Sequence, residues 1–160
     1  MQKTGNEEIM RQAAQMARET MRKGFGGPFG AAIVKDGKVI AVASNSVLKD
    51  DDPTAHAEIN AIRKAGKLLG THDLSDCELY ATGYPCPMCL SATIWANIKT
   101  VYYACTPEEA DRIGFRDDFI YRYLEQVRGN RTELICFAQT GHDDCLKLFE
   151  EYAKERKELY

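Results

Sequence analysis

The chain has 160 residues, a length that fits one domain able to bury about two thirds of its unfolded surface. Its 44% hydrophobic and 28% charged residues are ordinary for a globular protein, and no apolar run approaches the roughly 20 residues of a membrane span. The net charge is −3 without a Lys/Arg cluster, which argues against a nucleic-acid partner and favours a small uncharged ligand. The charged N-terminal segment is not a signal peptide, so we expect a cytoplasmic protein.

Apolar residues recur every three or four positions in residues 7–23, which predicts a core-packing helix ended by the glycines at 24, 26 and 27. Residues 30–35 and 39–47 are β-rich runs around Asp36-Gly37, a strong hairpin signal. Asn45 lies at the far end of this hairpin. It is either a turn residue or a binding group that offers a donor and an acceptor.

The middle of the chain alternates helices and strands. A helix is predicted from Ala55 to about Leu69, capped by Thr54, with Ile59, Ile62, Ala65 and Leu69 on its buried face. The pattern then predicts a strand over 77–82, a helix over 87–97 and a strand over 100–105. Strands separated by helices favour parallel pairing with helices on both faces.

The last third is predicted as a helix over 108–123 broken at 114–118, a short strand over 134–137 and a final helix over 143–157. The sum is a single-domain α/β sandwich of about five strands. Of the six cysteines, the four outside the C-x-x-C pair are expected to be buried small hydrophobes.

One imidazole and two thiols form a candidate zinc site. His56 precedes Cys86 by 30 residues and Cys89 by 33, and Pro87 predicts a helix start that places both thiols one turn apart on one helix face. Zn²⁺ is usually four-coordinate, so three protein ligands leave one position for water, as in catalytic sites. A structural zinc knuckle is the alternative, but no fourth Cys or His has suitable spacing.

Glu58 follows His56 by two residues and is the candidate acid/base. A carboxylate beside a zinc site can take a proton from water and hand it to a leaving nitrogen. The spacing of His56, Glu58, Cys86 and Cys89 matches the H-x-E…P-C-x-x-C signature of zinc deaminases.

Over nearly its full length, the chain resembles the cytidine deaminase-like superfamily and, within it, the bacterial guanine deaminases. The zinc motif fits the whole superfamily, whereas Gly114-Phe115, Phe119-Ile120-Tyr121 and the terminal tyrosine favour the guanine branch. The other matching stretches are Gly26-Gly27-Pro28-Phe29-Gly30-Ala31, Asp52-Pro53-Thr54-Ala55-His56-Ala57-Glu58 and Pro85-Cys86-Pro87-Met88-Cys89-Leu90.

The resemblance implies a three-layer α-β-α sandwich with a five-stranded mixed sheet. It implies zinc on the three ligands, proton shuttling by Glu58, a base contacted by Asn45 and stacked near Phe29, and a pocket closed by Asp117 and Tyr160. Ala57, between the ligand and the acid/base, belongs to the same substrate-binding set. The last helix, residues 143–160, would be exchanged between the subunits of a homodimer.

Two departures bear on the substrate. Tyr84 stands before Pro85-Cys86 where many relatives have Glu, and Arg116 stands where an acidic residue is common. A phenol in place of a carboxylate beside the metal loop can change which edge of a base is accepted.

The leading hypothesis is hydrolytic deamination of a free nucleobase, guanine first. The alternatives are guanosine, cytosine, isocytosine or a triazine, then a tRNA adenosine, for which the chain lacks a basic surface. A zinc-binding interaction protein without chemistry is a different class, and it would need no Glu58.

Overall fold

The computed structural model describes residues 5–126, 135 and 138–155, in two compact units, residues 1–118 and 119–160. Each unit is described by itself. The elements of the first unit, which ends where α6 begins, are α1 (Asn6–Arg22), β1 (Gly30–Lys35), β2 (Lys38–Ser44), α2 (Val47–Asp50), α3 (Ala57–Leu69), β3 (Cys77–Gly83), α4 (Pro87–Trp95), β4 (Thr100–Cys105) and α5 (Pro107–Arg112). Among the described residues, no helix has the length and apolar character that crossing a membrane requires.

The described strands form a mixed four-stranded sheet in the order β2-β1-β3-β4. β1 is antiparallel to both β2 and β3, and β3 is parallel to β4. The predicted hairpin is therefore confirmed, and parallel pairing is right for β3 and β4 but wrong for β1 and β3. The predicted fifth strand, at 134–137, lies outside the described residues except for Ile135.

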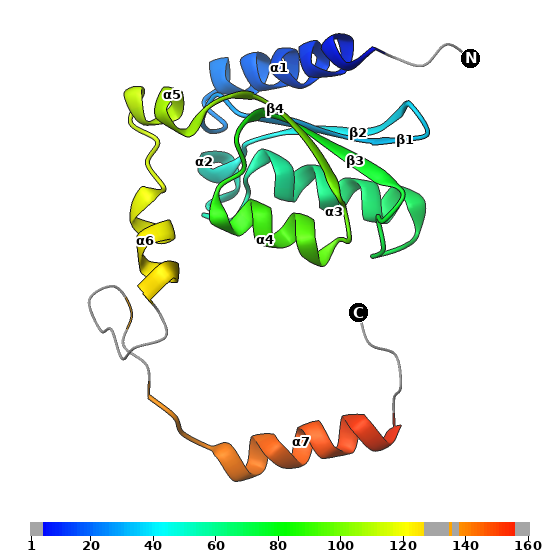
Figure 1. Ribbon diagram of the computed structural model, residues 1–160, viewed down its shortest axis with the longest axis vertical. Helices are drawn as coiled ribbons and strands as arrows, with labels where there is room; N and C mark the ends of the chain where they lie inside the picture. Colours follow the sequence, from blue (N-terminus) through cyan, green and yellow to red (C-terminus); the bar gives the residue numbers. More distant parts are fainter. Residues whose placement is uncertain (1–4, 127–134, 136–137, 156–160) are drawn as a thin grey trace. The chain divides into compact units, whose positions relative to one another are not determined.

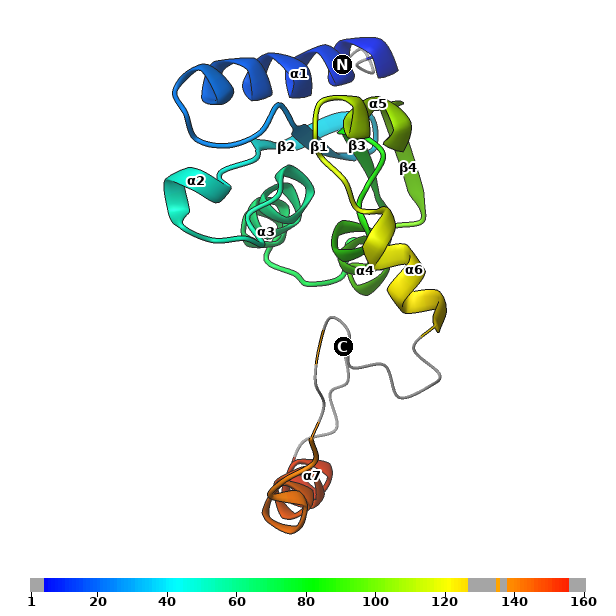
Figure 2. The ribbon, with the colours of Figure 1, turned by 90° about the vertical axis from the view of Figure 1, so that its left-hand side faces the viewer.

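Helices cover both faces of this sheet. α1 packs on one face, while α3 and α4 lie on the opposite face (Figures 1 and 2). The central strand β1 is buried on both sides: Ala31 and Ile33 join the core under α3, and Ala32 and Val34 join the core under α1. The first unit thus has three layers, as predicted.

The second strand of the hairpin is shorter than predicted. It ends at Ser44 because the Asn45 side chain accepts a hydrogen bond from the Val47 backbone N–H (3.1 Å) and starts a turn. The short helix α2 follows, with the Phe25 carbonyl accepting bonds from the N–H groups of Leu48 and Lys49. The end of the predicted strand is therefore replaced by α2, which is held by hydrogen bonds to the loop after α1.

α3 begins one residue after the candidate ligand His56, which is its N-cap, so the predicted cap at Thr54 is wrong. Thr54 instead donates from its N–H and hydroxyl to Asp52. The side of α3 against the sheet is a row of small residues at four-residue spacing, Ala57, Ala61 and Ala65, whereas the predicted isoleucines are half-buried. Alanine lets the helix lie close to the sheet.

The predicted helix over 108–123 is two helices. α5 ends at Arg112 and α6 spans Asp118–Gln126, with the break where Gly114 takes a φ of 93°. Glycine adopts this left-handed conformation without a steric penalty. The expected break is confirmed.

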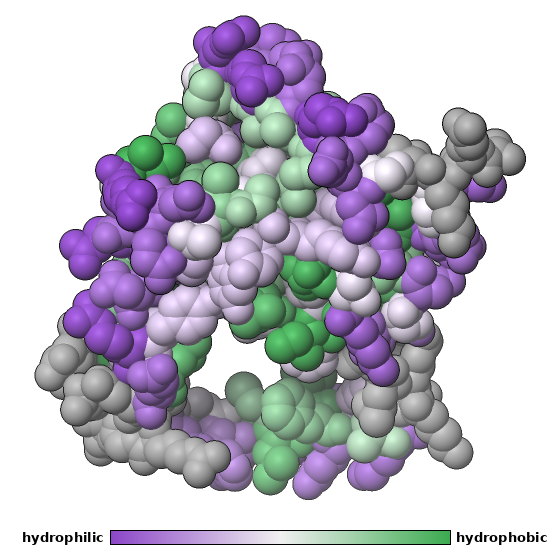
Figure 3. All heavy atoms as spheres, turned by 45° about the horizontal axis from the view of Figure 1, so that its top comes forward, coloured by the Kyte–Doolittle hydropathy of each residue, from purple (hydrophilic) through white to green (hydrophobic). Residues whose placement is uncertain are grey.

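The second unit contains α7 (His142–Glu155), close to the predicted 143–157. Leu146, Leu148, Phe149 and Tyr152 are exposed on this helix, and Figure 3 shows hydrophobic side chains at the surface there. An amphipathic helix with an exposed apolar side needs a partner surface.

The described cysteines are free thiols, and they correct one prediction. Cys77 is buried as expected, but Cys105 and Cys145 are exposed. Cys136, the fourth of this group, lies outside the described residues.

Candidate active site and metal centre

Two helix starts bring the metal-ligand candidates together. His56 is the N-cap of α3, Cys86 is the N-cap of α4, and Cys89 lies in the first turn of α4. An N-cap side chain often accepts a bond from its own helix, yet neither His56 nor Cys86 does. Both residues have an extended backbone, and because their side chains make no cap bond, the imidazole and the thiol are available to each other and to a metal.

The ligand atoms have the spacing of a zinc site. The Nδ1 atom of His56 lies 3.5 Å from Cys86 Sγ and 3.6 Å from Cys89 Sγ, and one ligand atom from each residue lies within 4.8 Å of the others. Tetrahedral zinc, with bonds of about 2.3 Å to sulfur and about 2.0 Å to nitrogen, separates N and S ligands by about 3.5 Å. The donors therefore fit Zn²⁺, and in the described part of the chain the cluster has three members.

The two thiols differ in acidity before any metal binds. A hydrogen bond from the Cys89 thiol lowers the pKa of Cys86 to about 4, with the His56 imidazole adding to it. The bond to Cys86 and burial raise the pKa of Cys89. Cys86 is thus the more acidic of the two thiols, and metal binding requires both thiols to lose their protons.

Glu58 is buried beside these ligands. Only 8% of its surface is exposed, and the Cys89 thiol donates to its Oε2 at 3.4 Å. Burial raises the pKa of Glu58, and the negative charge of Cys86 adds to this. A carboxylate with a raised pKa holds a proton more readily than an exposed carboxylate, which suits an acid/base catalyst.

The side-chain amide of Asn45 has its oxygen in a hydrogen bond and its nitrogen available to a ligand. Its Oδ1 is occupied by the Val47 N–H, and its Nδ2 has no hydrogen-bond partner among the described residues. The side chain lies directly on Gly26, where an added Cβ would overlap Oδ1. Asn45 is 6% exposed, so the orientation of this nearly buried donor is set by packing.

An aromatic pair lies next to Asn45. The Asn45 N–H donates to the Phe29 carbonyl (3.0 Å), and the Phe29 ring meets Phe115 edge-on with centroids 4.9 Å apart. Gly27 makes room for Phe115, since a Cβ there would lie 2.9 Å from the ring. Paired aromatic rings offer a stacking surface for a flat heterocycle.

Comparisons with known proteins agree with this geometry. The family model of the cytidine and deoxycytidylate deaminase zinc-binding region matches residues 3–105. The chain is 49% identical to a guanine deaminase of Bacillus subtilis (strain 168) over 127 residues, 79% of this chain and 81% of that protein. It is 43% identical to a tRNA-specific adenosine deaminase of Aquifex aeolicus (strain VF5) over 100 residues, 62% of this chain and 66% of that protein.

The fold agrees as well. An X-ray structure of guanine deaminase from Bacillus subtilis matches with a TM-score of 0.90 and 41% identity, covering 98% of this chain and 99% of that chain. The chain belongs to the cytidine and deoxycytidylate deaminase family. It is therefore a zinc-dependent hydrolytic deaminase, and the alternative of a non-enzymatic zinc protein is set aside.

Three more residues, Asp117, Tyr84 and Ala57, were predicted to contact the substrate. Burial and the charge of Cys86 raise the pKa of Asp117, so this carboxyl interacts electrostatically with one of the ligand candidates. Tyr84 is 41% exposed and meets Tyr103 edge-on, with centroids 5.0 Å apart. The Ala57 side chain is fully buried, which leaves only its backbone to meet a substrate.

Two predicted features need separate mention. Tyr160 lies outside the described residues. Arg116, the second departure from the family pattern, pairs with Asp111 (3.1 Å) and Asp118 (3.4 Å) on the surface.

Phe115 and Gly26 were not predicted as site residues. Their signals in the sequence were the Gly-Phe pair and the run of glycines before Phe29, which were read as family markers and as a helix end. Only the fold shows that Gly26 contacts Asn45 and that Phe115 contacts Phe29.

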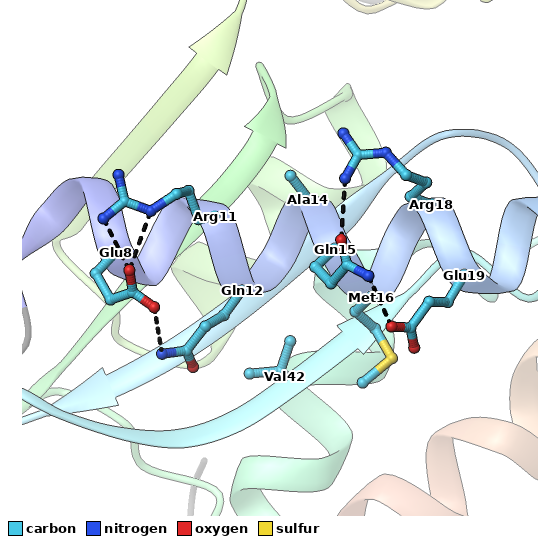
Figure 4. Close-up of a pocket in the computed structure, with 9 residues that line it drawn as sticks. All are labelled: Glu8, Arg11, Gln12, Ala14, Gln15, Met16, Arg18, Glu19 and Val42. Atoms are coloured by element: carbon cyan, nitrogen blue, oxygen red, sulfur yellow. Dashed lines mark hydrogen bonds and ion pairs between the residues drawn. The ribbon is translucent and has the colours of Figure 1, made fainter.

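A surface hollow along α1 and β2 is separate from the metal centre (Figure 4). Its polar side chains pair with their helical neighbours: Arg11 with Glu8 at 2.8 Å, and Gln15 with Glu19 at 2.8 Å. These exposed i,i+3 and i,i+4 contacts stabilise the helix surface and leave no convergent group for a ligand.

Proposed function

We propose that this protein deaminates guanine hydrolytically, giving xanthine and ammonia. The observation that carries the proposal is the His56–Cys86–Cys89 centre beside a buried Glu58, on a chain 49% identical to a guanine deaminase over most of both lengths. The net charge of −3 and the small aromatic surroundings of Asn45 suit a free base.

The metal's part is limited to activating water. His56, Cys86 and Cys89 would hold Zn²⁺, which when bound would lower the pKa of water so that the water can attack near neutral pH.

Glu58 moves the protons. It accepts one proton from the attacking water as the water oxygen bonds to C2 of guanine, and it gives that proton to the ring nitrogen N3. It then carries the second proton of that water, from the new hydroxyl group at C2, to the exocyclic nitrogen. The C2–N bond then breaks, ammonia leaves, and xanthine remains with oxygen at C2. The burial of Glu58 keeps its carboxylate close to the reacting atoms and away from bulk water.

The base is held by groups around this centre. Asn45 donates from Nδ2 to an acceptor on the base, and Phe29 stacks on its ring, supported edge-on by Phe115. The backbone of Ala57, the Tyr84 phenol and the Asp117 carboxyl complete the set of contacts. Tyr84 in place of a carboxylate leaves one fewer acceptor for the donors on the base.

The proposed assembly is a homodimer in the cytoplasm. In this proposal the whole chain acts as one domain, and the C-terminal segment that carries α7 exchanges between subunits so that Tyr160 closes the partner's pocket. The exposed apolar side of α7 supports a packed partner for this helix. The free thiols suit a reducing compartment.

Deamination of a tRNA adenosine is the second candidate, because a relative with that name is 43% identical over 100 residues. The acidic net charge weighs against it, since RNA binding rests largely on neutralising phosphates. Other small aminated substrates, namely guanosine, cytosine, isocytosine and triazines, use the same chemistry.

A substrate panel tests the proposal. Ammonia release is measured with guanine, guanosine, cytosine, isocytosine, an aminated triazine, adenosine and a tRNA, with zinc content determined on the same sample. The expected result is turnover of guanine at least about tenfold faster, as kcat/KM, than of any other member. Zinc-loaded protein that prefers another substrate overturns the choice of guanine.

A further inference from the structure

Asn60 ties together two loops of the site. Its Nδ2 lies 2.9 Å from the Ser44 carbonyl oxygen, 2.9 Å from the Ser46 hydroxyl and 3.3 Å from the Ala55 carbonyl oxygen. Ser44 and Ser46 are the residues on either side of Asn45, and Ala55 precedes the metal ligand on the other loop. One amide group on α3 therefore contacts both loops.

The backbone of Asn60 is fixed by the first turn of α3. Asn60 stands one helical turn after His56 and donates its backbone N–H to the His56 carbonyl (2.9 Å). The two loops also meet directly, because the Ser46 N–H donates to the Ala55 carbonyl (3.0 Å). The Ser46 hydroxyl donates onward to Asp50 (2.6 Å), so the bonds run from α3 through the loop into α2.

We propose that Asn60 is a positioning residue for substrate binding: it sets the place of Asn45 relative to the metal centre. The inference rests on the proposed function, in which Asn45 binds the base. Asn60 acts only through its neighbours, since its amide bonds the residues that flank Asn45 and not Asn45 itself.

The bond lengths indicate which kinetic constant depends on Asn60. Its two short bonds go to Ser44 and Ser46, whereas the longer bond goes to Ala55, whose carbonyl also accepts from Ser46. His56 and Glu58 remain held by the start of α3. Loss of the amide donor thus displaces the base-binding group and leaves the metal ligands and the acid/base in place, which raises KM and spares kcat.

Two variants remove the donor in different ways. Asn60→Asp keeps the shape but turns oxygen lone pairs toward the acceptors, and Asn60→Ala removes the group if the aspartate variant fails to fold. The matched control is Lys64→Met on the next turn of α3, which removes a side-chain bond to the Val42 carbonyl (3.2 Å) on β2, away from the loops.

Steady-state kinetics with guanine, zinc content and amide hydrogen exchange are measured on all four proteins. We expect KM to rise by about tenfold or more and kcat to stay within about threefold in the Asn60 variants, with one zinc retained. Exchange at the amides of residues 45–47, which bond Phe29, Ala55 and Asn45 itself, should quicken by about tenfold or more, and Lys64→Met should change neither.

Unchanged KM, unchanged exchange at 45–47, or the same effects in Lys64→Met would each overturn the proposal. If the wild-type protein does not deaminate guanine, the proposed function fails, and the exchange experiment alone decides the role of Asn60.

Discussion

At the scale of residues, local backbone features set the side chains of the candidate metal ligands and of Asn45. His56 and Cys86 are helix N-caps whose side chains make no cap bond, and Asn45 is oriented by the Val47 N–H. The ligands and Glu58 were predictable because the signature depends on short spacings along the chain. The orientation of Asn45 was not, because it depends on Gly26, which is distant in sequence.

Replacing Glu58 with Gln keeps the size of the side chain and removes its ability to carry a proton. We expect zinc content and fold to persist while kcat falls by about 10² or more, the usual contribution of an acid/base group. Turnover and zinc are measured on the same preparation. A variant with more than about a tenth of wild-type activity would remove Glu58 from the mechanism.

We expect Glu58→Gln to change how the stability of the metal-free protein depends on pH. Burial raises the folded-state pKa of Glu58 above its ordinary 4.5, so between these two values the folded protein holds a proton that the unfolded chain has lost. This group therefore destabilises the fold as pH rises through that window, and Gln does not.

Chelator-treated wild-type protein and Glu58→Gln are compared by urea unfolding at several pH values. The free energy of unfolding of Glu58→Gln, relative to wild type, should increase as pH rises above about 4.5 and level off beyond the raised pKa. A difference that does not vary with pH would show that burial does not perturb this carboxyl.

At the scale of elements, the loop with Gly26 and Gly27 after α1 packs against Asn45 and Phe115, on the side of the site that is proposed to bind the base. The hairpin and the helices were predictable from Asp36-Gly37 and from apolar periodicity. The early end of β2 and the close approach of α3 through its alanine row were not, because both depend on contacts between segments far apart in sequence.

Gly26→Ala tests the packing of this loop. The added methyl group overlaps Asn45, so we expect kcat/KM to fall by about tenfold or more, or about 1.4 kcal/mol of transition-state binding, mainly through KM. The control is Gly5→Ala, where an added methyl meets open space at an ordinary φ of −68°. Equal kinetics in the two variants would mean that Gly26 has no role in placing Asn45.

At the scale of the whole molecule, α7 has more apolar surface than its own unit covers. The charged run before Leu159-Tyr160 allows two readings of the terminus, a solvated end or a segment that closes a partner's pocket. Periodicity predicted the helix but not its partner, because an apolar side indicates that a helix is covered without indicating which surface covers it.

Deleting Leu159 and Tyr160 separates the two readings. If the tail closes the pocket, zinc content and folding stay nearly intact while kcat/KM falls by about tenfold or more. Oligomeric state is followed by light scattering. Unchanged kinetics in the truncated protein, or a fully active monomer, would show that the terminus is solvated.

The central claim is hydrolysis of guanine at the zinc centre, and turnover in water enriched in heavy oxygen tests it most directly. Mass spectrometry of the product and an ammonia assay are run on zinc-loaded wild-type protein, with Glu58→Gln alongside. The account predicts xanthine carrying one heavy oxygen atom, one ammonia per xanthine, and almost no product from Glu58→Gln. Zinc-loaded protein that leaves guanine unchanged, or a Glu58→Gln protein that forms labelled xanthine at the wild-type rate, would contradict it.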